Sequence, residues 1–313
     1  MSSAEAPGPD RATVAVLGAR GFVGRAIVAA LRARDVPTVL RTSDRPAVRE
    51  GELDPQVAGA ASVVVVTGRT NPAMAERDSA TAARELAESR QLFDLLTASR
   101  ARLPGTQRIV LASSGGSVYD TRRQPPYRES SDTAPSSAYA GLKLDIEDAL
   151  LSTAARDSER TVLRLSNAYG PGQRTGTGQG VVGHWFEALR SGQPVRLFGD
   201  PETIRDYVYI DDVAAAFVAV HLADGPLPSI LNVGSGRPTS LRELLTLVLH
   251  AADRPDQPVE FTSDRPFDRR HTWLDISEAR RTLGWQPTTS LEAGLRLAWN
   301  NLTTTGDPAP QRR

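Results

Sequence analysis

The chain begins, after a polar tail at residues 1–11, with an apolar stretch, a glycine-rich turn and a helical pattern in direct succession. Thr13–Leu17 is short, apolar and rich in β-branched side chains, which predicts a buried strand. Glycines let the backbone approach a phosphate closely, and the N-terminus of the following helix attracts negative charge. This order predicts the pyrophosphate site of a dinucleotide, with a plain strand-to-helix turn as the alternative. The predicted cofactor contacts are Gly18, Arg20, Gly21, Phe22, Val23 and Gly24.

A second predicted strand indicates which dinucleotide would bind. Val36–Leu40 has a strand pattern, and Arg41 and Thr42, also predicted cofactor contacts, follow it. NAD-binding proteins usually place a carboxylate at this strand end to hold the ribose 2′-hydroxyl, whereas arginine suits the 2′-phosphate of NADP. Arg20 would add positive charge to the same site. The sequence therefore predicts NADP, and NAD is the alternative if Asp44 takes the ribose hydroxyls.

Strands and helices continue to alternate, which predicts a parallel, doubly wound sheet. A third strand is expected to present Glu52 and Leu53 to the adenine. Ser62–Val66 has the pattern of a fourth strand, and a long helix is expected over residues 75–99. The predicted cofactor contacts in this part of the chain are Glu52, Leu53, Thr67 and Gly68.

The stretch from residue 108 to residue 143 is the predicted catalytic segment. Arg108–Ala112 has the pattern of a buried strand, and a turn rich in serine and glycine follows it. Ligands of open α/β sheets bind at this end of the strands. Tyr139 and Lys143 lie one helical turn apart and therefore on one face of a helix. The predicted catalytic residues are Ser114, Ser117, Tyr139 and Lys143.

The spacing of Tyr139 and Lys143 suits proton transfer. A tyrosine that exchanges a proton near neutral pH needs its pKa lowered from about 10 to about 7, which corresponds to about 4 kcal/mol. A lysine ammonium one turn away supplies part of this, and Tyr139 and Lys143 would also contact the cofactor. A serine hydroxyl would hold the substrate oxygen on which charge develops. A surface helix with an incidental tyrosine and lysine is the alternative.

Composition excludes several other classes of protein. The 313 residues include 37 basic and 37 acidic side chains, a balance that argues against binding to nucleic acid or a membrane surface. The absence of cysteine excludes disulfides and thiol catalysis, and no metal site is predicted. No apolar run reaches transmembrane length, and the polar N-terminus lacks a signal-peptide core. A cytoplasmic location is therefore expected.

Several motifs together resemble the extended short-chain dehydrogenase/reductase family, and within it enzymes that act on nucleotide-diphosphate sugars. The motifs are G-A-R-G-F-V-G, S-S-G-G-S-V-Y, Y-A-G-L-K, S-N-A-Y-G-P-G, R-D-Y-V-Y-I-D-D-V, N-V-G-S-G and L-G-W-x-P. The resemblance implies an α/β fold: a Rossmann-type doubly wound parallel sheet with a smaller mixed α/β substrate-binding domain. The expected division assigns residues 12–166 and about 207–233 to the cofactor domain, 167–206 and 234–302 to the nucleotide-sugar domain, and 303–313 to a tail.

The resemblance also implies roles for individual residues. Tyr139 matches the proton donor and acceptor, and Lys143 matches the residue that holds the nicotinamide ribose. The implied substrate contacts are Asn167, Phe198, Arg205, Arg265 and Asp268. Two positions depart from the pattern. Gly115 stands where epimerases often have serine, which leaves the hydroxyl role to Ser117 or Ser114. Glu85 stands at the position of a mid-helix asparagine near the cofactor.

The reaction can be narrowed by elimination. The acidic pair that sugar 4,6-dehydratases carry is absent, since glycines and Ser117 occupy its place. A 4-ketoreductase that consumes NADPH is favoured by Arg41 and Arg20, and resembles reductases that complete dTDP-linked deoxysugars for glycosylated metabolites. A 4-epimerase that retains NAD is the alternative, and a non-catalytic NADP sensor is a third possibility on the same fold. The resemblance further implies a homodimer.

Overall fold

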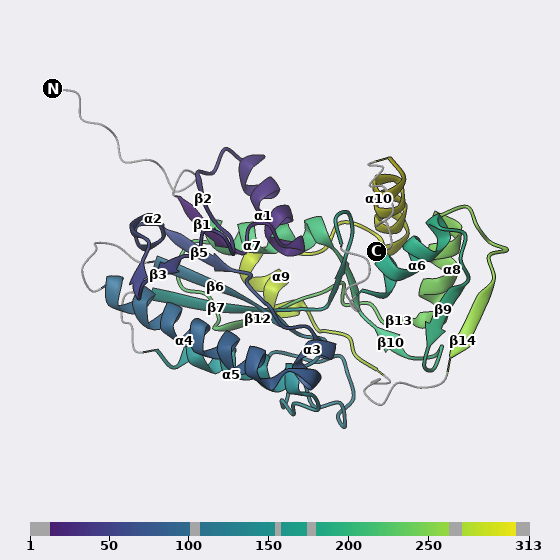
Figure 1. Ribbon diagram of the computed structural model, residues 1–313, viewed down its shortest axis with the longest axis horizontal. Coiled ribbons are helices and arrows are strands. Elements are labelled where there is room, and N and C mark those ends of the chain that lie inside the picture. Colours follow the sequence, from purple (N-terminus) through teal and green to yellow (C-terminus); the bar gives the residue numbers. More distant parts are fainter. Residues whose placement is uncertain (1–12, 101–106, 154–157, 174–179, 263–270, 305–313) are drawn as a thin grey trace.

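The computed structural model describes residues 13–100, 107–153, 158–173, 180–262 and 271–304. Its centre is a six-stranded sheet in which every neighbouring pair is parallel (Figure 1). In spatial order the strands are β2 (Thr38–Arg41), β1 (Val14–Leu17), β5 (Ser62–Val65), β6 (Gln107–Ser114), β7 (Ser158–Leu165) and β12 (Ile230–Val233). Along the chain, β2 is added on one side of β1 and the later strands are added on the other side, as in doubly wound sheets. The expected α/β class and parallel Rossmann-type sheet are confirmed.

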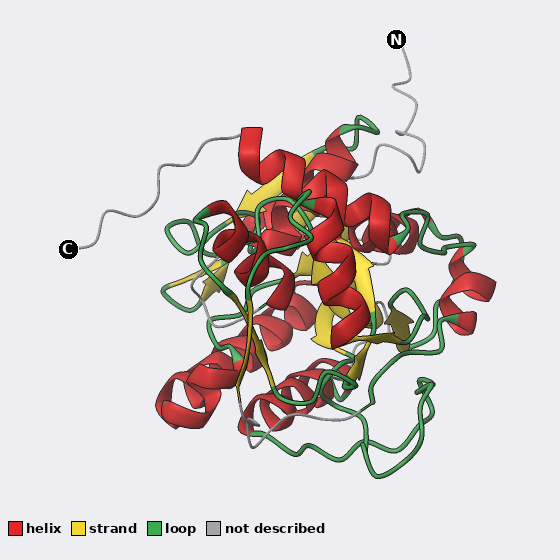
Figure 2. Cartoon of the chain, turned by 90° about the vertical axis from the view of Figure 1, so that its right-hand side faces the viewer, coloured by secondary structure: helices red, strands yellow, loops and turns green. Residues whose placement is uncertain are grey.

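Helices cover both faces of this sheet (Figure 2). They are α1 (Phe22–Arg32), α7 (Ile210–Leu222) and α9 (Ser277–Leu283) on one side, and α2 (Pro55–Ala58), α3 (Pro72–Arg77), α4 (Ser79–Arg100) and α5 (Ala138–Leu151) on the other. Because both faces are covered, the sheet strands must be apolar at successive positions. In β1, Val14 and Val16 join the core under α1 and α7, whereas Ala15 and Leu17 join the core under α4 and α5. No helix among the described residues is both long and apolar enough to cross a membrane.

Two glycines shape the turn between β1 and α1. Gly18 has a φ of +92°, and a Cβ added there would lie 2.7 Å from the carbonyl oxygen of Val66. At Gly24 an added Cβ would collide with the carbonyl oxygen of Gly18. The first glycine therefore permits the backbone conformation, and the second permits close contact between helix and turn.

A smaller unit with two-stranded sheets, some parallel and one antiparallel, lies beside the main sheet, to the right in Figure 1. Its strands form the pairs β8 (Asn167–Tyr169) with β11 (Tyr207–Tyr209), β9 (Val195–Phe198) with β14 (Val259–Thr262), and β10 (Ile204–Arg205) with β13 (Thr239–Ser240). Its helices are α6 (Val181–Arg190), α8 (Leu241–Ala251) and α10 (Leu291–Thr304). Their buried side chains join the same apolar cluster as α1 and α7, so this unit packs continuously against one side of the main sheet.

Two sequence expectations need correction. Glu52 and Leu53 form β4 (Glu52–Leu53), which pairs antiparallel with β3 (Val48–Arg49) in a separate hairpin and is not a third strand of the main sheet. The single helix expected over residues 75–99 is two helices, α3 and α4, which break at Asp78. The Asp78 carboxylate accepts hydrogen bonds from the backbone N–H and the hydroxyl of Thr81, so it caps the start of α4.

Candidate active site

The C-terminal edge of the sheet brings the predicted cofactor turns together. The N–H of Gly18 donates to the carbonyl of Arg41 at 2.9 Å, which joins the glycine turn to the end of β2. A Cβ added at Gly68, after β5, would lie 3.7 Å from the Lys143 Nζ. The left-handed Gly18 and the close contact at Gly24 leave the backbone open to the approach that a pyrophosphate needs. The residues present therefore fit a dinucleotide whose far end reaches Lys143.

The predicted catalytic pair lies on the first turns of α5. Ser137 caps this helix by accepting a hydrogen bond from the N–H of Ala140 at 3.2 Å. The Lys143 Nζ lies 5.4 Å from the centre of the Tyr139 ring, so the two side chains share a helix face as their spacing predicts. The Tyr139 side chain is half-buried, whereas Lys143 is buried. The pair therefore combines an accessible phenol with a fixed cation.

A carboxylate from α4 accompanies this cation. The Glu85 Oε1 lies 3.2 Å from the Lys143 Nζ, and its Oε2 accepts hydrogen bonds from the N–H groups of Arg69 and Thr70, both at 2.9 Å. Burial disfavours the charged lysine, but the charges of Tyr139 and Glu85 outweigh it and raise the pKa of Lys143 above its ordinary value. Burial also opposes ionisation of Glu85, yet the ammonium and the hydrogen bonds hold its pKa below the usual range. Both groups are therefore charged at neutral pH.

The serines after β6 differ in their surroundings. The Ser113 hydroxyl is buried and donates to Glu147, so it is directed away from the sheet edge into a buried network. Ser114 and Ser117 are half-buried, and the Ser117 Oγ lies 3.4 Å from the carbonyl oxygen of Ser114. A hydroxyl for the substrate oxygen would therefore come from Ser114 or Ser117, as the sequence predicts.

Packing explains why position 115 is glycine. A Cβ added at Gly115 would lie 2.7 Å from the Leu274 Cδ1 and 3.0 Å from the carbonyl oxygen of Arg164. Both distances are shorter than ordinary van der Waals contact, and Leu274 is buried. Any larger residue at position 115 would therefore require the Leu274 side chain to shift.

The cations expected near the cofactor ribose already have acidic partners. The Arg41 Nη2 lies 2.6 Å from the Asp54 Oδ1 and donates to Gln56 at 3.0 Å. Burial opposes the charged carboxylate, but the hydrogen bond from Arg41 helps to hold the pKa of Asp54 below its usual range. Arg20 pairs with Asp44 at 2.8 Å on an exposed surface, where Asp44 also accepts from the hydroxyl of Thr42. A ribose phosphate would therefore have to compete with two carboxylates for these guanidinium groups.

The predicted substrate contacts that the structure describes lie on the smaller unit. Asn167 is exposed at the start of β8, and a Cβ added at Gly116 would lie 4.0 Å from its Nδ2. Arg205 is half-buried on β10, and Phe198 is exposed at the end of β9. Asn167 thus lies beside the serine turn. Arg265 and Asp268 lie outside the described residues.

A model of the NAD dependent epimerase/dehydratase family matches residues 14–234 of this chain. The chain belongs to this family. The match covers the glycine turn, the serine turn and the Tyr139–Lys143 pair, so the coarse expectation of a nicotinamide cofactor follows from membership. The extended short-chain dehydrogenase/reductase fold of the family agrees with the sheet and helix order described above.

Relatives within the epimerase/dehydratase family have different activities. UDP-glucose 4-epimerase of Mycolicibacterium smegmatis is 41% identical over 63% of this chain and 63% of its own length. dTDP-4-dehydro-6-deoxyglucose reductase of Escherichia coli is 31% identical over 61% of this chain and 60% of its own length. The chain thus spans less than two thirds of each of these curated relatives. The solved structure of RMD from Pseudomonas aeruginosa complexed with NADPH is 25% identical, with a TM-score of 0.77 over 94% of this chain and 100% of the other.

Sequence reasoning missed two features of this family member. Asp206 is buried and accepts hydrogen bonds from the hydroxyls of Ser166 and Ser235 and from the N–H groups of Ser235, Gly236 and Leu274. Burial raises the pKa of this carboxyl, although these hydrogen bonds oppose the shift. Asp206 thereby joins three loops at the sheet edge, and its place in R-D-Y was the available signal. The second missed feature is in the sequence itself, where Lys143 is the only lysine among the 37 basic residues.

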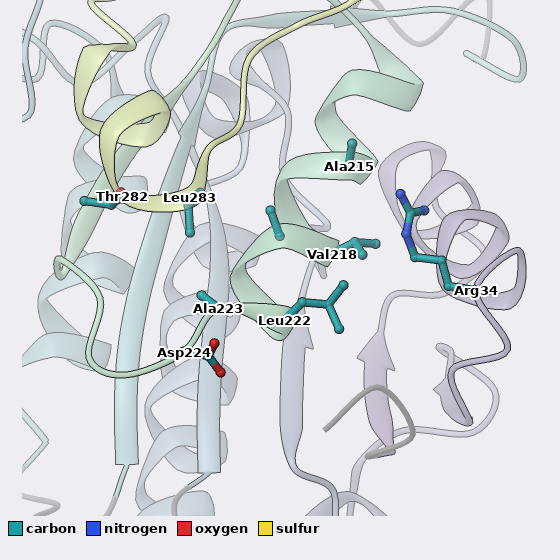
Figure 3. Close-up of a pocket in the computed structure, with 9 residues that line it drawn as sticks. Arg34, Ala215, Val218, Leu222, Ala223, Asp224, Thr282 and Leu283 are labelled. Carbon is teal, nitrogen blue, oxygen red and sulfur yellow. The ribbon is translucent and has the colours of Figure 1, made fainter. Parts of the chain in front are cut away.

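One surface hollow lies away from this site. A space of about 330 Å³ lies between Arg34, the end of α7 and the end of α9. Figure 3 draws the residues that line it. Because these helices run opposite to the parallel strands, their C-terminal ends lie at the other edge of the sheet. The residues that line this hollow include the aliphatic Val218 and Leu222, and Arg34 and Asp224 lie at its margins. No group of histidine, cysteine or acidic residues within the described ranges could hold a metal ion.

Proposed function

We propose that this protein reduces the C4 ketone of a nucleotide-diphosphate 4-keto-6-deoxysugar, dTDP-linked, with NADPH as the reductant. The observation that carries the nicotinamide-dependent chemistry is the phenol of Tyr139 beside the buried ammonium of Lys143, next to the Gly68 turn, and the choice of a reductase depends on Arg41. This arrangement places an acid near the end of the dinucleotide that the glycine turn would bind. A bound nicotinamide supplies the hydride for the ketone carbon.

The chain's own groups would manage the oxygen and its proton. Tyr139 gives its proton to the oxygen as the ketone becomes an alcohol, and Lys143 holds the nicotinamide ribose. The hydroxyl of Ser117 or Ser114 orients the carbonyl before the reaction. Proton transfer of this kind contributes about 10²–10⁴-fold to the rate. No carboxylate follows Ser114 in the turn, which argues against the proton abstraction at C5 that a 4,6-dehydratase needs.

The smaller unit would bind the nucleotide diphosphate. Asn167, which lies beside the serine turn, suits the phosphates, and the guanidinium of Arg205 suits the diphosphate charge. The exposed ring of Phe198 suits stacking on the base. Arg265 and Asp268 complete the proposed contacts, which together would place the sugar between Asn167 and Tyr139.

An NAD-dependent 4-epimerase is the second candidate. The UDP-glucose 4-epimerase of M. smegmatis is more similar to this chain than the E. coli reductase is, at 41% against 31% identity. An epimerase and a reductase both need the Tyr139–Lys143 pair, so this pair does not separate them. We base the choice of a reductase on the end of β2, because a consumed reductant is usually NADPH and Arg41 suits its 2′-phosphate.

The Arg41→Asp variant is expected to lose the preference for NADPH over NADH by about 10–100-fold, measured as kcat/KM with each cofactor. The guanidinium makes a charge-assisted contact worth about 1.5–3 kcal/mol, and an aspartate would repel the phosphate. Because Asp54 competes for the same guanidinium at 2.6 Å, Asp54→Asn is expected to strengthen NADPH binding. Oxidation of NADPH is followed by absorbance with a panel of 4-keto sugar nucleotides as substrates.

The control for Arg41→Asp is Arg281→Asp on α9, where the arginine is exposed and pairs with Glu278. This variant should leave the cofactor preference unchanged. A wild-type protein that prefers NADH, or that retains NAD and interconverts C4 epimers without added reductant, would replace the reductase by the epimerase.

A further inference from the structure

We propose that Glu85 is a positioning residue that keeps the active site in its proton-donating form, by balancing the charge of Lys143. This inference rests on the proposed reduction and extends it to the pH range in which the reduction runs. The resemblance leads one to expect an asparagine at position 85, and the charge of Glu85 is what this difference would add to the site.

The geometry fixes the Glu85 carboxylate against the lysine. Its two oxygens are divided between the Lys143 Nζ at 3.2 Å and the N–H groups of Arg69 and Thr70 at 2.9 Å. Glu85 and Lys143 are 6% and 8% exposed, so solvent screens their attraction little. The loop carrying Arg69 and Thr70 follows Gly68, where the nicotinamide end of the cofactor would lie. Glu85 thus links the lysine to the cofactor loop as well as to α4.

The charge of Glu85 acts on two neighbours in opposite ways. It stabilises the Lys143 ammonium, which is consistent with the raised pKa of that lysine. It also offsets the pull that the ammonium exerts on a Tyr139 phenolate, and therefore favours the neutral phenol. A reductase needs this neutral phenol, because Tyr139 must give a proton to the substrate oxygen.

The other charged groups around Lys143 do not replace Glu85. Glu147 lies one turn further along α5, but it is paired with Arg164 of β7 at 2.7 Å. Arg69 pairs with Glu88 at 3.1 Å on the exposed side of α4. Glu76 of α3 accepts a hydrogen bond from the N–H of Ala138 at the start of α5. Besides Glu85, the titratable groups whose charge acts on Lys143 are therefore Tyr139 and Glu147, and the charge of Glu147 is balanced by Arg164.

A single lysine makes the pairing directly measurable. Because Lys143 is the only lysine of the chain, the protein grown with ¹³C-labelled lysine gives one lysine Cε signal by NMR. In the wild type this signal should keep its charged position to a higher pH than that of an ordinary lysine. In Glu85→Gln it should begin to titrate about one unit lower or more, because the ammonium has lost its counter-charge. This readout needs no substrate and no turnover.

The pH dependence of catalysis is the second readout. The basic limb of the kcat profile for reduction should move to lower pH in Glu85→Gln, because the carboxylate that balances the Lys143 ammonium is gone. The reverse oxidation should gain at neutral pH. Glu88→Gln, three residues further along α4 and exposed, is the matched control and should move neither the lysine signal nor the limb.

The outcomes separate this inference from the proposed function. An unchanged lysine titration in Glu85→Gln overturns the inference even if the protein is an active reductase. A shifted titration supports the pairing even if the substrate proves to be different. If Glu85→Gln does not fold, Glu85→Asn provides the same test, and an unchanged lysine titration and pH limb in that variant would also overturn the inference.

Discussion

Replacing Tyr139 by phenylalanine should lower kcat by about 10²–10⁴-fold, the usual contribution of a positioned general acid. The variant loses only the phenolic hydroxyl, and the Lys143 ammonium stays in place through its contact with Glu85 at 3.2 Å. Cofactor affinity should therefore remain close to that of the wild type. Turnover is measured with saturating NADPH and substrate, and cofactor binding is measured separately by titration.

The matched control for this variant is Tyr127→Phe. The Tyr127 ring is buried and its hydroxyl donates to the carbonyl of Arg123 at 2.9 Å, so loss of this hydroxyl should cost about 1 kcal/mol of stability and little turnover. If Tyr139→Phe kept most of the wild-type kcat while Tyr127→Phe did the same, Tyr139 would not be the proton donor. Loss of cofactor binding in Tyr139→Phe would instead indicate that the hydroxyl serves mainly to hold the cofactor.

Replacing Glu147 by glutamine should lower the free energy of unfolding by about 3–5 kcal/mol, because it leaves the Arg164 guanidinium buried without its counter-charge. The two side chains are 2% and 4% exposed, and two nitrogens of Arg164 contact the carboxylate at 2.7–3.2 Å. Glu147 also accepts the Ser113 hydroxyl, and the Arg164 guanidinium stacks over the Tyr119 ring at 4.9 Å. Unfolding in urea, followed by circular dichroism, measures the loss.

An exposed ion pair provides the comparison for Glu147. Glu202 lies 2.6 Å from Arg242, with both side chains more than half exposed, so Glu202→Gln should cost less than about 1 kcal/mol. The double variant Glu147→Gln, Arg164→Gln should cost less than the sum of its single variants. Equal losses for Glu147→Gln and Glu202→Gln would contradict the role assigned to the buried pair.

The sheet and the contact between Tyr139 and Lys143 could be predicted because their signals are local in the sequence. A strand buried on both faces must be apolar throughout, which made β1 and β5 readable, and the spacing of Tyr139 and Lys143 fixed their common helix face. The break at Asp78 also had a local signal, since aspartate commonly caps a helix. Because the residues on both sides of Asp78 have a helical pattern, the sequence nevertheless predicted one continuous helix over residues 75–99.

The charge pairs could not be predicted, because each depends on residues that only the fold brings together. Nothing in the sequence around Arg41 shows that Asp54 and Gln56 will turn back to contact it. The glycine at position 115 is explained by Leu274, which lies far away in the sequence. Sequence patterns thus located the chemical groups, whereas their partners and available space required the tertiary structure.

Transfer of deuterium tests the proposed reduction most directly. NADPH carrying deuterium at the transferable position of its nicotinamide ring is incubated with a dTDP-linked 4-keto-6-deoxysugar, and the product is examined by NMR and mass spectrometry. We expect one deuterium at the sugar C4 and one NADP formed for each product molecule. A product without deuterium, or C4 epimers interconverted with no NADPH consumed, would contradict the assignment of this protein as a 4-ketoreductase.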